Sequence, residues 1–230
     1  MNIPLGTRKK LKISLATFLL RFLHRIFNRP RIWRIMNRTF YVHPKVFLPR
    51  YTVTSSFLAM NLRISKSTQV LDLGTGIGIQ AIFAAEKAKR IIATDINPHA
   101  VKCARINVNL NNLKHKIEIR KGDMFEPVKN EKFDVILFNP PYITRRPKTM
   151  LERAWFCGEN NELIGEFISG AKKHLKSHGY VQILYSTLGN LAFLLEKFDE
   201  EGYKVKKIAE KKTYFERFVI YIAKYIAKSN

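Results

Sequence analysis

Along most of this chain, short apolar runs typical of strands alternate with segments whose apolar residues recur at helical spacing. Short apolar runs typical of buried strands occur at residues 69–73, 91–95, 116–120, 133–138 and 179–185. Segments with helical periodicity lie at residues 78–88, 97–111, 162–176 and 189–201. Residues 203–209 and 213–226 predict a closing antiparallel pair. Repeated strand–helix units predict an α/β fold with a mostly parallel, doubly wound sheet and helices on both faces.

A separate helical pattern precedes these units, at residues 11–28, and Pro30 ends it. Its apolar side consists of Leu11, Leu15, Phe18, Leu19, Phe22, Leu23 and Ile26. Three uses of this helix stay open from the sequence. It can pack against the rest of the protein, its cationic side can follow phosphates, or it can lie on a membrane surface.

Residues 29–50 are basic with interleaved aromatic side chains. Such a segment suits base stacking combined with phosphate neutralisation. It equally suits a short pair of strands that covers the edge of a site. We therefore divide the chain into a basic N-terminal helix and cap segment, residues 1–50, and a main domain, residues 51–230.

The chain of 230 residues has a formal charge of +23, and this charge is uneven. Residues 1–71 contain 14 Lys or Arg and no acidic residue. This excess favours RNA, DNA or an anionic membrane surface as a partner, although a solvated basic surface explains it as well. Cys103 and Cys157 have no metal-binding or redox spacing, and no metal is expected. No apolar run reaches the length of a spanning helix, so we expect a cytoplasmic protein.

A glycine-rich turn, Asp72-Leu-Gly-Thr-Gly-Ile-Gly78, follows the first strand and opens a helix. A dinucleotide-binding turn would place its third glycine at position 79, where this chain has Ile79. The observed spacing instead suits a nucleoside that carries an amino acid. Because Gly74, Gly76 and Gly78 have no side chain, the backbone can approach the ligand closely. Asp72 is expected near the ammonium group, and Thr75 adds a polar contact.

Two later strand ends complete this predicted cofactor site. Asp95 ends the second strand, where a carboxylate can accept both ribose hydroxyls, and Ile96 follows it. Asp123 can accept the adenine amine, and Met124 offers apolar contact to the ring. The set in this order predicts S-adenosylmethionine as the cofactor.

The tetrapeptide Asn139-Pro-Pro-Tyr142 closes the strand at 133–138. A planar amide or base amine is a poor nucleophile because its lone pair is delocalised. The side-chain oxygen of Asn139 and the carbonyl of Pro140 can each accept one N–H and stabilise the charge that develops on nitrogen. Pro141 helps to fix the loop, and Tyr142 presents a flat face for stacking. Asn139 is also counted among the cofactor contacts.

These motifs resemble those of class I S-adenosylmethionine methyltransferases, and within them the HemK-like group, over residues 48–226. The resemblance implies a seven-stranded sheet with a reversed final hairpin. It also implies methylation of the glutamine amide in the Gly-Gly-Gln loop of translation release factors, with Asn139 and Pro140 holding that amide. Arg50 falls in the segment that resembles the loop before the domain. Trp155 falls in a substrate-side loop, so Pro141, Arg50 and Trp155 are expected to contact the substrate.

Two alternatives to a protein substrate stay open. The same tetrapeptide serves enzymes that methylate adenine N6 or guanine N2 in RNA or DNA, and the basic N-terminus favours these. The second alternative is a non-catalytic module that binds nucleic acid or a membrane surface through its N-terminal segment.

Overall fold

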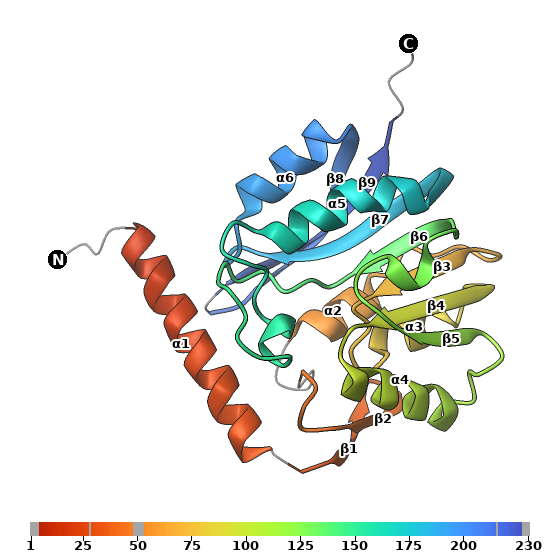
Figure 1. Ribbon diagram of the computed structural model, residues 1–230, viewed down its shortest axis with the longest axis horizontal. Coiled ribbons are helices and arrows are strands. Elements are labelled where there is room, and N and C mark those ends of the chain that lie inside the picture. The colour runs from red at the N-terminus through yellow and green to blue at the C-terminus, as the bar shows by residue number, and fades with distance from the viewer. Residues whose placement is uncertain (1–4, 28, 48–52, 215, 227–230) are drawn as a thin grey trace.

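The computed structural model describes residues 5–27, 29–47, 53–214 and 216–226 (Figure 1). Its central sheet has seven strands, and six of the seven run in the same direction. Their order across the sheet is β5 (Ile117–Lys121), β4 (Arg90–Asp95), β3 (Gln69–Leu73), β6 (Phe133–Phe138), β7 (Leu175–Ser186), β9 (Arg217–Tyr225) and β8 (Tyr203–Lys212). Strand β9 alone is reversed, so the predicted sheet and its antiparallel end are confirmed.

Helices cover both faces of this sheet because side chains alternate along each strand. On one face Val70, Ile91 and Val135 pack with α3 (Ile79–Ala84) and α4 (Pro98–Leu110). On the other face Leu71, Ile92 and Ile136 pack with two helices from the second half of the chain, α5 (Glu162–His174) and α6 (Leu191–Glu200). Helix α2 (Thr54–Met60), which the sequence pattern did not predict, packs against α3.

The basic and aromatic segment after the N-terminal helix contains a strand pair, β1 (Arg31–Ile35) and β2 (Arg38–Val42). Phe40 is fully buried in the core formed with α3 and α4. Of the two uses predicted for this segment, the structure therefore shows the strand pair. The predicted division between residues 50 and 51 falls in 48–52, outside the described residues.

Helix α1 (Leu5–Ile26) lies along one side of the molecule, and the loop that follows β6 lies between it and the sheet (Figure 1). It packs against the main domain through Ile13, Leu20 and Phe27, which lie outside the predicted apolar side, and through Leu23, which belongs to it. Thr17 and His24 are buried, and the Arg21 guanidinium pairs with Glu152 at 2.6 Å. Most of the predicted apolar side faces outward, and Phe18 is 64% exposed. Amphipathicity predicted the helix correctly but not the side that it buries.

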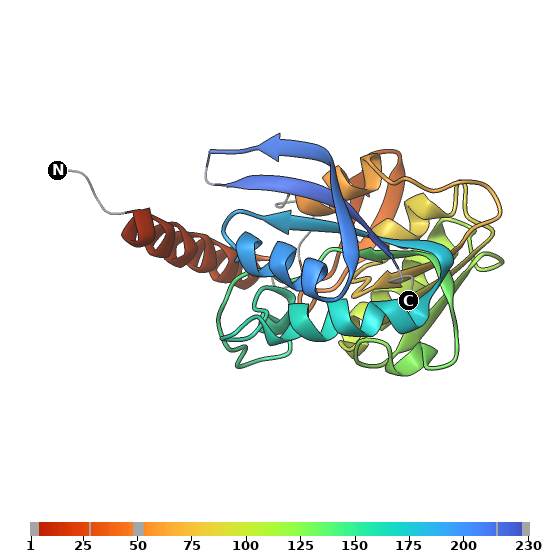
Figure 2. The same cartoon turned by 90° about the horizontal axis from the view of Figure 1, so that it is seen from above.

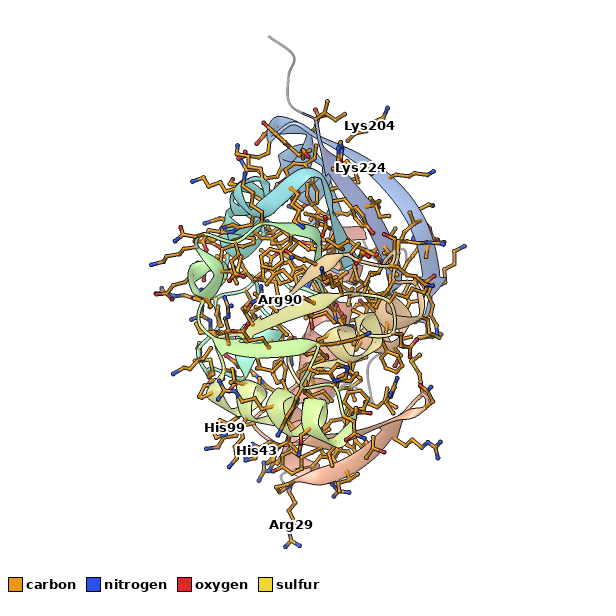
Figure 3. The ribbon with its side chains drawn as sticks, turned by 90° about the vertical axis from the view of Figure 1, so that its right-hand side faces the viewer. Arg29, His43, Arg90, His99, Lys204 and Lys224 are labelled. Atoms are coloured by element: carbon orange, nitrogen blue, oxygen red, sulfur yellow. The ribbon has the colours of Figure 1, made fainter. Side chains whose placement is uncertain are left out.

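Basic side chains are spread over the surface. Figure 3 shows Arg29 at one end of the molecule and Lys204 and Lys224 at the other. Among the described residues, no helix combines the length and apolarity needed to cross a membrane. Within the same ranges no group of three His, Cys, Asp or Glu side chains can hold a metal ion. Cys103 and Cys157 are both buried and unbridged.

Asn107 joins three parts of this fold. It is fully buried in α4, and its Nδ2 donates to the carbonyls of Tyr41 in β2 at 2.9 Å and of Ile77 in the glycine turn at 2.8 Å. Its Oδ1 accepts the Tyr41 N–H at 2.6 Å. The strand pair is thus fixed to the helix and to the turn by one side chain.

We predict that Asn107→Ala lowers the free energy of unfolding by about 3 kcal/mol, because three backbone groups lose their partner in the interior. Asn111→Ala is the matched control one turn later in the chain, where the side chain bonds Thr39 near the surface. It should cost less than about 1 kcal/mol. Urea unfolding measures both values, and equal losses would contradict the role given to Asn107.

Candidate active site

Parallel register brings the predicted motifs to one edge of the sheet. Leu73 of β3 lies opposite Thr94 of β4 and Phe138 of β6. Asp95 of β4 lies opposite Lys121 of β5. The next residues of all four strands therefore leave the sheet side by side, at its carboxyl edge, where ligands bind in folds of this kind.

The glycine turn adopts a backbone that requires glycine. Gly74, Gly76 and Gly78 have φ values of 63°, 59° and 90°, which L side chains rarely adopt. Asp72 supports this turn from below. Its Oδ2 accepts the Thr75 hydroxyl at 2.6 Å and the Ala81 N–H at 3.1 Å. Burial raises the pKa of this carboxyl to about 7.

Asp95 joins the glycine turn to the start of α4. Its Oδ2 accepts the Gly76 N–H and its Oδ1 accepts the Asn97 N–H, both at 2.8 Å. Each carboxylate oxygen has a second lone pair, so the group can still accept two hydroxyls. Burial raises the pKa of Asp95 above its usual range, while these two N–H donors oppose the shift. Asn97 caps α4 by accepting the His99 N–H at 3.0 Å, which leaves Asp95 free of that task.

The loop after β5 lies beside Asp95, because the Gly122 N–H donates to the Asp95 carbonyl at 3.1 Å. The Asp123 Oδ2 accepts Arg153 Nη2 at 2.9 Å. Met124 has a φ of 43°, an unusual value for a residue that is not glycine. The loop thus presents one carboxylate, already paired with an arginine, and one thioether.

The motifs share one cavity of about 440 Å³, which is within the range of small-molecule sites. Most of the predicted site residues line it. They are Gly74, Thr75, Gly76, Asp95, Ile96, Asp123, Met124, Asn139, Pro140, Pro141, Tyr142 and Trp155. Asp72 and Gly78 do not line it, so the predicted contact of Asp72 with an ammonium group finds no support in its position. Arg50 lies outside the described residues.

Asn139 contacts α2 at the wall of the cavity. Its Nδ2 lies 3.4 Å from the Ser55 Oγ. In this orientation the amide nitrogen is turned to Ser55, and the amide oxygen stays available as an acceptor. Ser55 also accepts Gln80 Nε2 at 3.0 Å through its carbonyl, which ties α2 to α3.

Tyr142 is held by a carboxylate that the sequence analysis missed. Its hydroxyl donates to Glu216, which also accepts the Ser186 hydroxyl. Burial raises the pKa of Glu216. The Tyr142 ring meets Tyr185 and Phe218 edge to face, at centroid distances of 6.2 and 6.4 Å. These contacts fix the ring where it lines the cavity.

Trp155 forms part of the wall between the cavity and α1. It is 4% exposed, and its Nε1–H has no hydrogen-bond partner among the described residues. Its ring lies 5.3 Å from that of His24 in α1. A buried donor without a partner costs about 1–3 kcal/mol.

Sequence reasoning missed Ser55, Glu216 and the cavity-lining side of α1, which includes Leu20. Ser55 lies in α2, which is short and contains no recognisable motif, so the sequence did not mark it. The one available signal for Glu216 was a single acid in an otherwise basic hairpin segment, residues 211–217. A rare acid in such surroundings is a candidate for a specific contact.

The sheet, its reversed strand and the cavity at its carboxyl edge define a class I methyltransferase fold. Residues 37–215 match the methyltransferase small domain family, and the chain belongs to this family. It is a methyltransferase, and its cofactor is S-adenosylmethionine.

Two relatives show how far the similarity extends. A putative protein N5-glutamine methyltransferase of Methanocaldococcus jannaschii is 38% identical over 78% of this chain and 91% of its own length. The release factor glutamine methyltransferase of Aquifex aeolicus is 30% identical over 79% of this chain and 65% of its own length. The chain thus spans just under two thirds of the Aquifex protein.

Solved structures are similar in fold. A tRNA methyltransferase of M. jannaschii has a TM-score of 0.64 at 21% identity, over 88% of this chain and 58% of its own. A 16S rRNA methyltransferase of T. thermophilus, in complex with AdoMet and guanosine, has a TM-score of 0.64 at 22% identity, over 86% of this chain and 50% of its own. At these identities the likeness shows the fold alone.

We predict that Asp95→Ala weakens binding of S-adenosylmethionine by about 1–3 kcal/mol, because two hydroxyl acceptors are lost. In the unchanged protein the affinity should fall as the pH is lowered towards the raised pKa of Asp95, because a proton then competes for the carboxylate. Calorimetric titration at a series of decreasing pH values measures both effects.

Asp134→Ala is the control for this prediction. Asp134 also accepts a backbone N–H, that of Gln69 at 2.7 Å, but it does not line the cavity. Its loss should leave cofactor affinity unchanged. An Asp95→Ala protein that binds the cofactor as tightly as the original would exclude the ribose contact.

We predict that Glu216→Leu lowers kcat about tenfold, since the Tyr142 ring is no longer held at its hydroxyl, while the Kd for the cofactor stays unchanged. Glu216→Gln keeps an oxygen acceptor and should recover most of the activity. Glu210→Leu, on the same hairpin but paired with Lys207 and Arg217 at the surface, is the control. Equal kcat values for Glu216→Leu and Glu210→Leu would contradict this positioning role.

Proposed function

We propose that this protein transfers a methyl group from S-adenosylmethionine to the side-chain amide of a glutamine in a translation release factor. The observation that carries the proposal is the position of Asn139-Pro-Pro-Tyr142 in the same cavity as the glycine turn and Asp95. The names of the two relatives, from M. jannaschii and A. aeolicus, support glutamine as the acceptor.

The reacting amide would be bound by two oxygen acceptors. The Asn139 side-chain oxygen takes one N–H, and the orientation imposed by Ser55 leaves that oxygen available. The Pro140 carbonyl takes the other N–H. Two acceptors raise the electron density on the amide nitrogen and stabilise positive charge that develops there during transfer. Tyr142, held by Glu216, packs against the flat amide, and Pro141 keeps the loop rigid.

The residues present fit S-adenosylmethionine. Gly74, Thr75 and Gly76 would approach the methionine part through the backbone, and Asp95 would accept the ribose hydroxyls. The pair Asp123 and Met124 would face the adenine. We assign Asp72 to support of the turn, because its accepting oxygen is used within the turn. The cofactor would supply a methyl group on a positively charged sulfur. When the carbon–sulfur bond breaks, the sulfur would leave as a neutral thioether, and the methylated amide nitrogen would release one of its two protons to water.

A base amine is the second candidate acceptor. It is supported by the 14 basic and no acidic residues in positions 1–71. However, basic side chains are spread over the surface in Figure 3. The relatives from M. jannaschii and A. aeolicus, which cover 78% and 79% of this chain, are named for glutamine. We therefore favour the protein acceptor and make nucleic acid an outcome of the test.

The test uses radiolabelled cofactor with a cell lysate, divided into halves treated with RNase or with protease. The proposal expects label in the macromolecular fraction that protease removes and RNase leaves. A purified release factor with its Gly-Gly-Gln loop should accept one methyl group, and its Gln→Ala variant none. Label that RNase removes would assign a nucleic-acid acceptor instead.

Asn139→Ala should abolish transfer to the release factor while the Kd for the cofactor changes little, because the variant loses an acceptor for the substrate amide. Steady-state kinetics and calorimetry measure the two effects. Replacement of Arg31 and Arg34 by alanine is the control and should leave activity on the release factor unchanged. Loss of cofactor binding together with transfer in Asn139→Ala would contradict the role assigned to Asn139.

A further inference from the structure

Helix α1 carries an apolar stripe on its outward side. We call this stripe the outer stripe, and it consists of Leu11, Leu15, Phe18, Leu19, Phe22 and Ile26. Leu19, at its edge, also lines the cavity. These side chains are between 40% and 64% exposed. Figure 2 shows the N-terminal end of the helix extending beyond the rest of the molecule. Large exposed apolar patches of this kind mark interaction surfaces.

The outer stripe cannot turn inward, because the opposite side of α1 is held along its length. Near the start, Lys9 Nζ donates to the Gly189 carbonyl at 2.7 Å. In the middle, Leu20 packs in the cluster of Trp155, and Arg21 pairs with Glu152. Near the end, His24 Nδ1 lies 3.3 Å from the Pro44 carbonyl. The helix is thus fixed with its apolar side facing solvent.

Basic residues border the outer stripe on both sides. Residues seven positions apart lie on the same side of a helix, so Arg25 lies along the line of Phe18, and Lys12 along that of Leu19. Arg29 follows the end of α1, and Figure 3 shows it extending away from the molecule. No acidic residue occurs in positions 1–71, so these borders contain basic and neutral residues of the helix but no acidic one.

We propose that the outer stripe of α1 docks this protein on an anionic lipid surface. An apolar stripe between basic borders is the pattern of helices that lie in the plane of a membrane interface, and the basic residues would meet the anionic headgroups. A second copy of the chain would bring cations against cations. Nucleic acid would leave Leu11, Leu15 and Ile26 without a partner, since these have no ring on which a base can stack.

The experiment is flotation of the full-length protein with vesicles. Vesicles of equal parts phosphatidylglycerol and phosphatidylcholine should bind it, vesicles of phosphatidylcholine alone should bind it at least about tenfold less, and binding should fall as salt is raised. Leu15→Glu should reduce binding to the anionic vesicles about tenfold or more, because it places an anion within the stripe.

Leu110→Glu is the matched control. Leu110 ends α4 and is 47% exposed, against 43% for Leu15, so both substitutions replace a half-exposed leucine on a helix. The Leu110 variant should bind vesicles as the original protein does. Neither residue lines the cavity, and both variants should bind S-adenosylmethionine normally, which shows that they are folded.

Three results would overturn the proposal. The first is an original protein that does not float with anionic vesicles. The second is equal loss of binding in the Leu15 and Leu110 variants. The third is a dimer in sedimentation, or a complex with RNA, that is lost in the Leu15→Glu variant but kept in the Leu110→Glu variant. The outer stripe would then bind that partner.

Discussion

The site depends on the parallel register of β3 with its two neighbours. Because Leu73 lies opposite both Thr94 and Phe138, the glycine turn, Asp95 and Asn139 leave the sheet at the same level. A slip of one residue would turn each strand's side chains to the other face of the sheet and expose its apolar set. The buried residues on both faces therefore fix the positions of the polar residues at the edge. The packing of the core therefore also determines the geometry of the cavity.

The main sheet could be predicted because its signals are local. Buried parallel strands are continuous apolar runs, and the bounds expected at 69–73 and 133–138 agree with β3 and β6. The motifs that follow these strands share a cavity for the same reason. Asp72 shows the limit of prediction from local sequence. Its place before the glycine turn predicted a contact with the ammonium group, whereas the direction of its hydrogen bonds in space favours support of the turn.

Long-range contacts explain what the sequence could not show. Glu216 meets Tyr142 across 74 positions of the chain, and nothing near either residue marks the pair. The prediction of which side of α1 is buried was wrong for another reason. Helical periodicity shows that a helix has an apolar side, but it does not say what covers that side. Here Thr17 and His24 are buried on the same side as Ile13, Leu20 and Phe27, which pack against the main domain. The Thr17 hydroxyl donates to the Ile13 carbonyl within the helix, and the His24 ring lies 3.3 Å from the Pro44 carbonyl.

This arrangement has a consequence for how firmly α1 is held. The Arg21–Glu152 pair is half exposed on the arginine side, and such pairs contribute about 0–1 kcal/mol. Full burial of one leucine or phenylalanine would contribute about 1.5–3 kcal/mol, yet six large apolar side chains of the helix face solvent. The helix is thus held by these directional contacts together with the apolar packing of Ile13, Leu20, Leu23 and Phe27, while the six exposed apolar side chains stay unused. Because Leu20 and Trp155 line the cavity, any partner that covers the outer stripe would also steady one wall of the site.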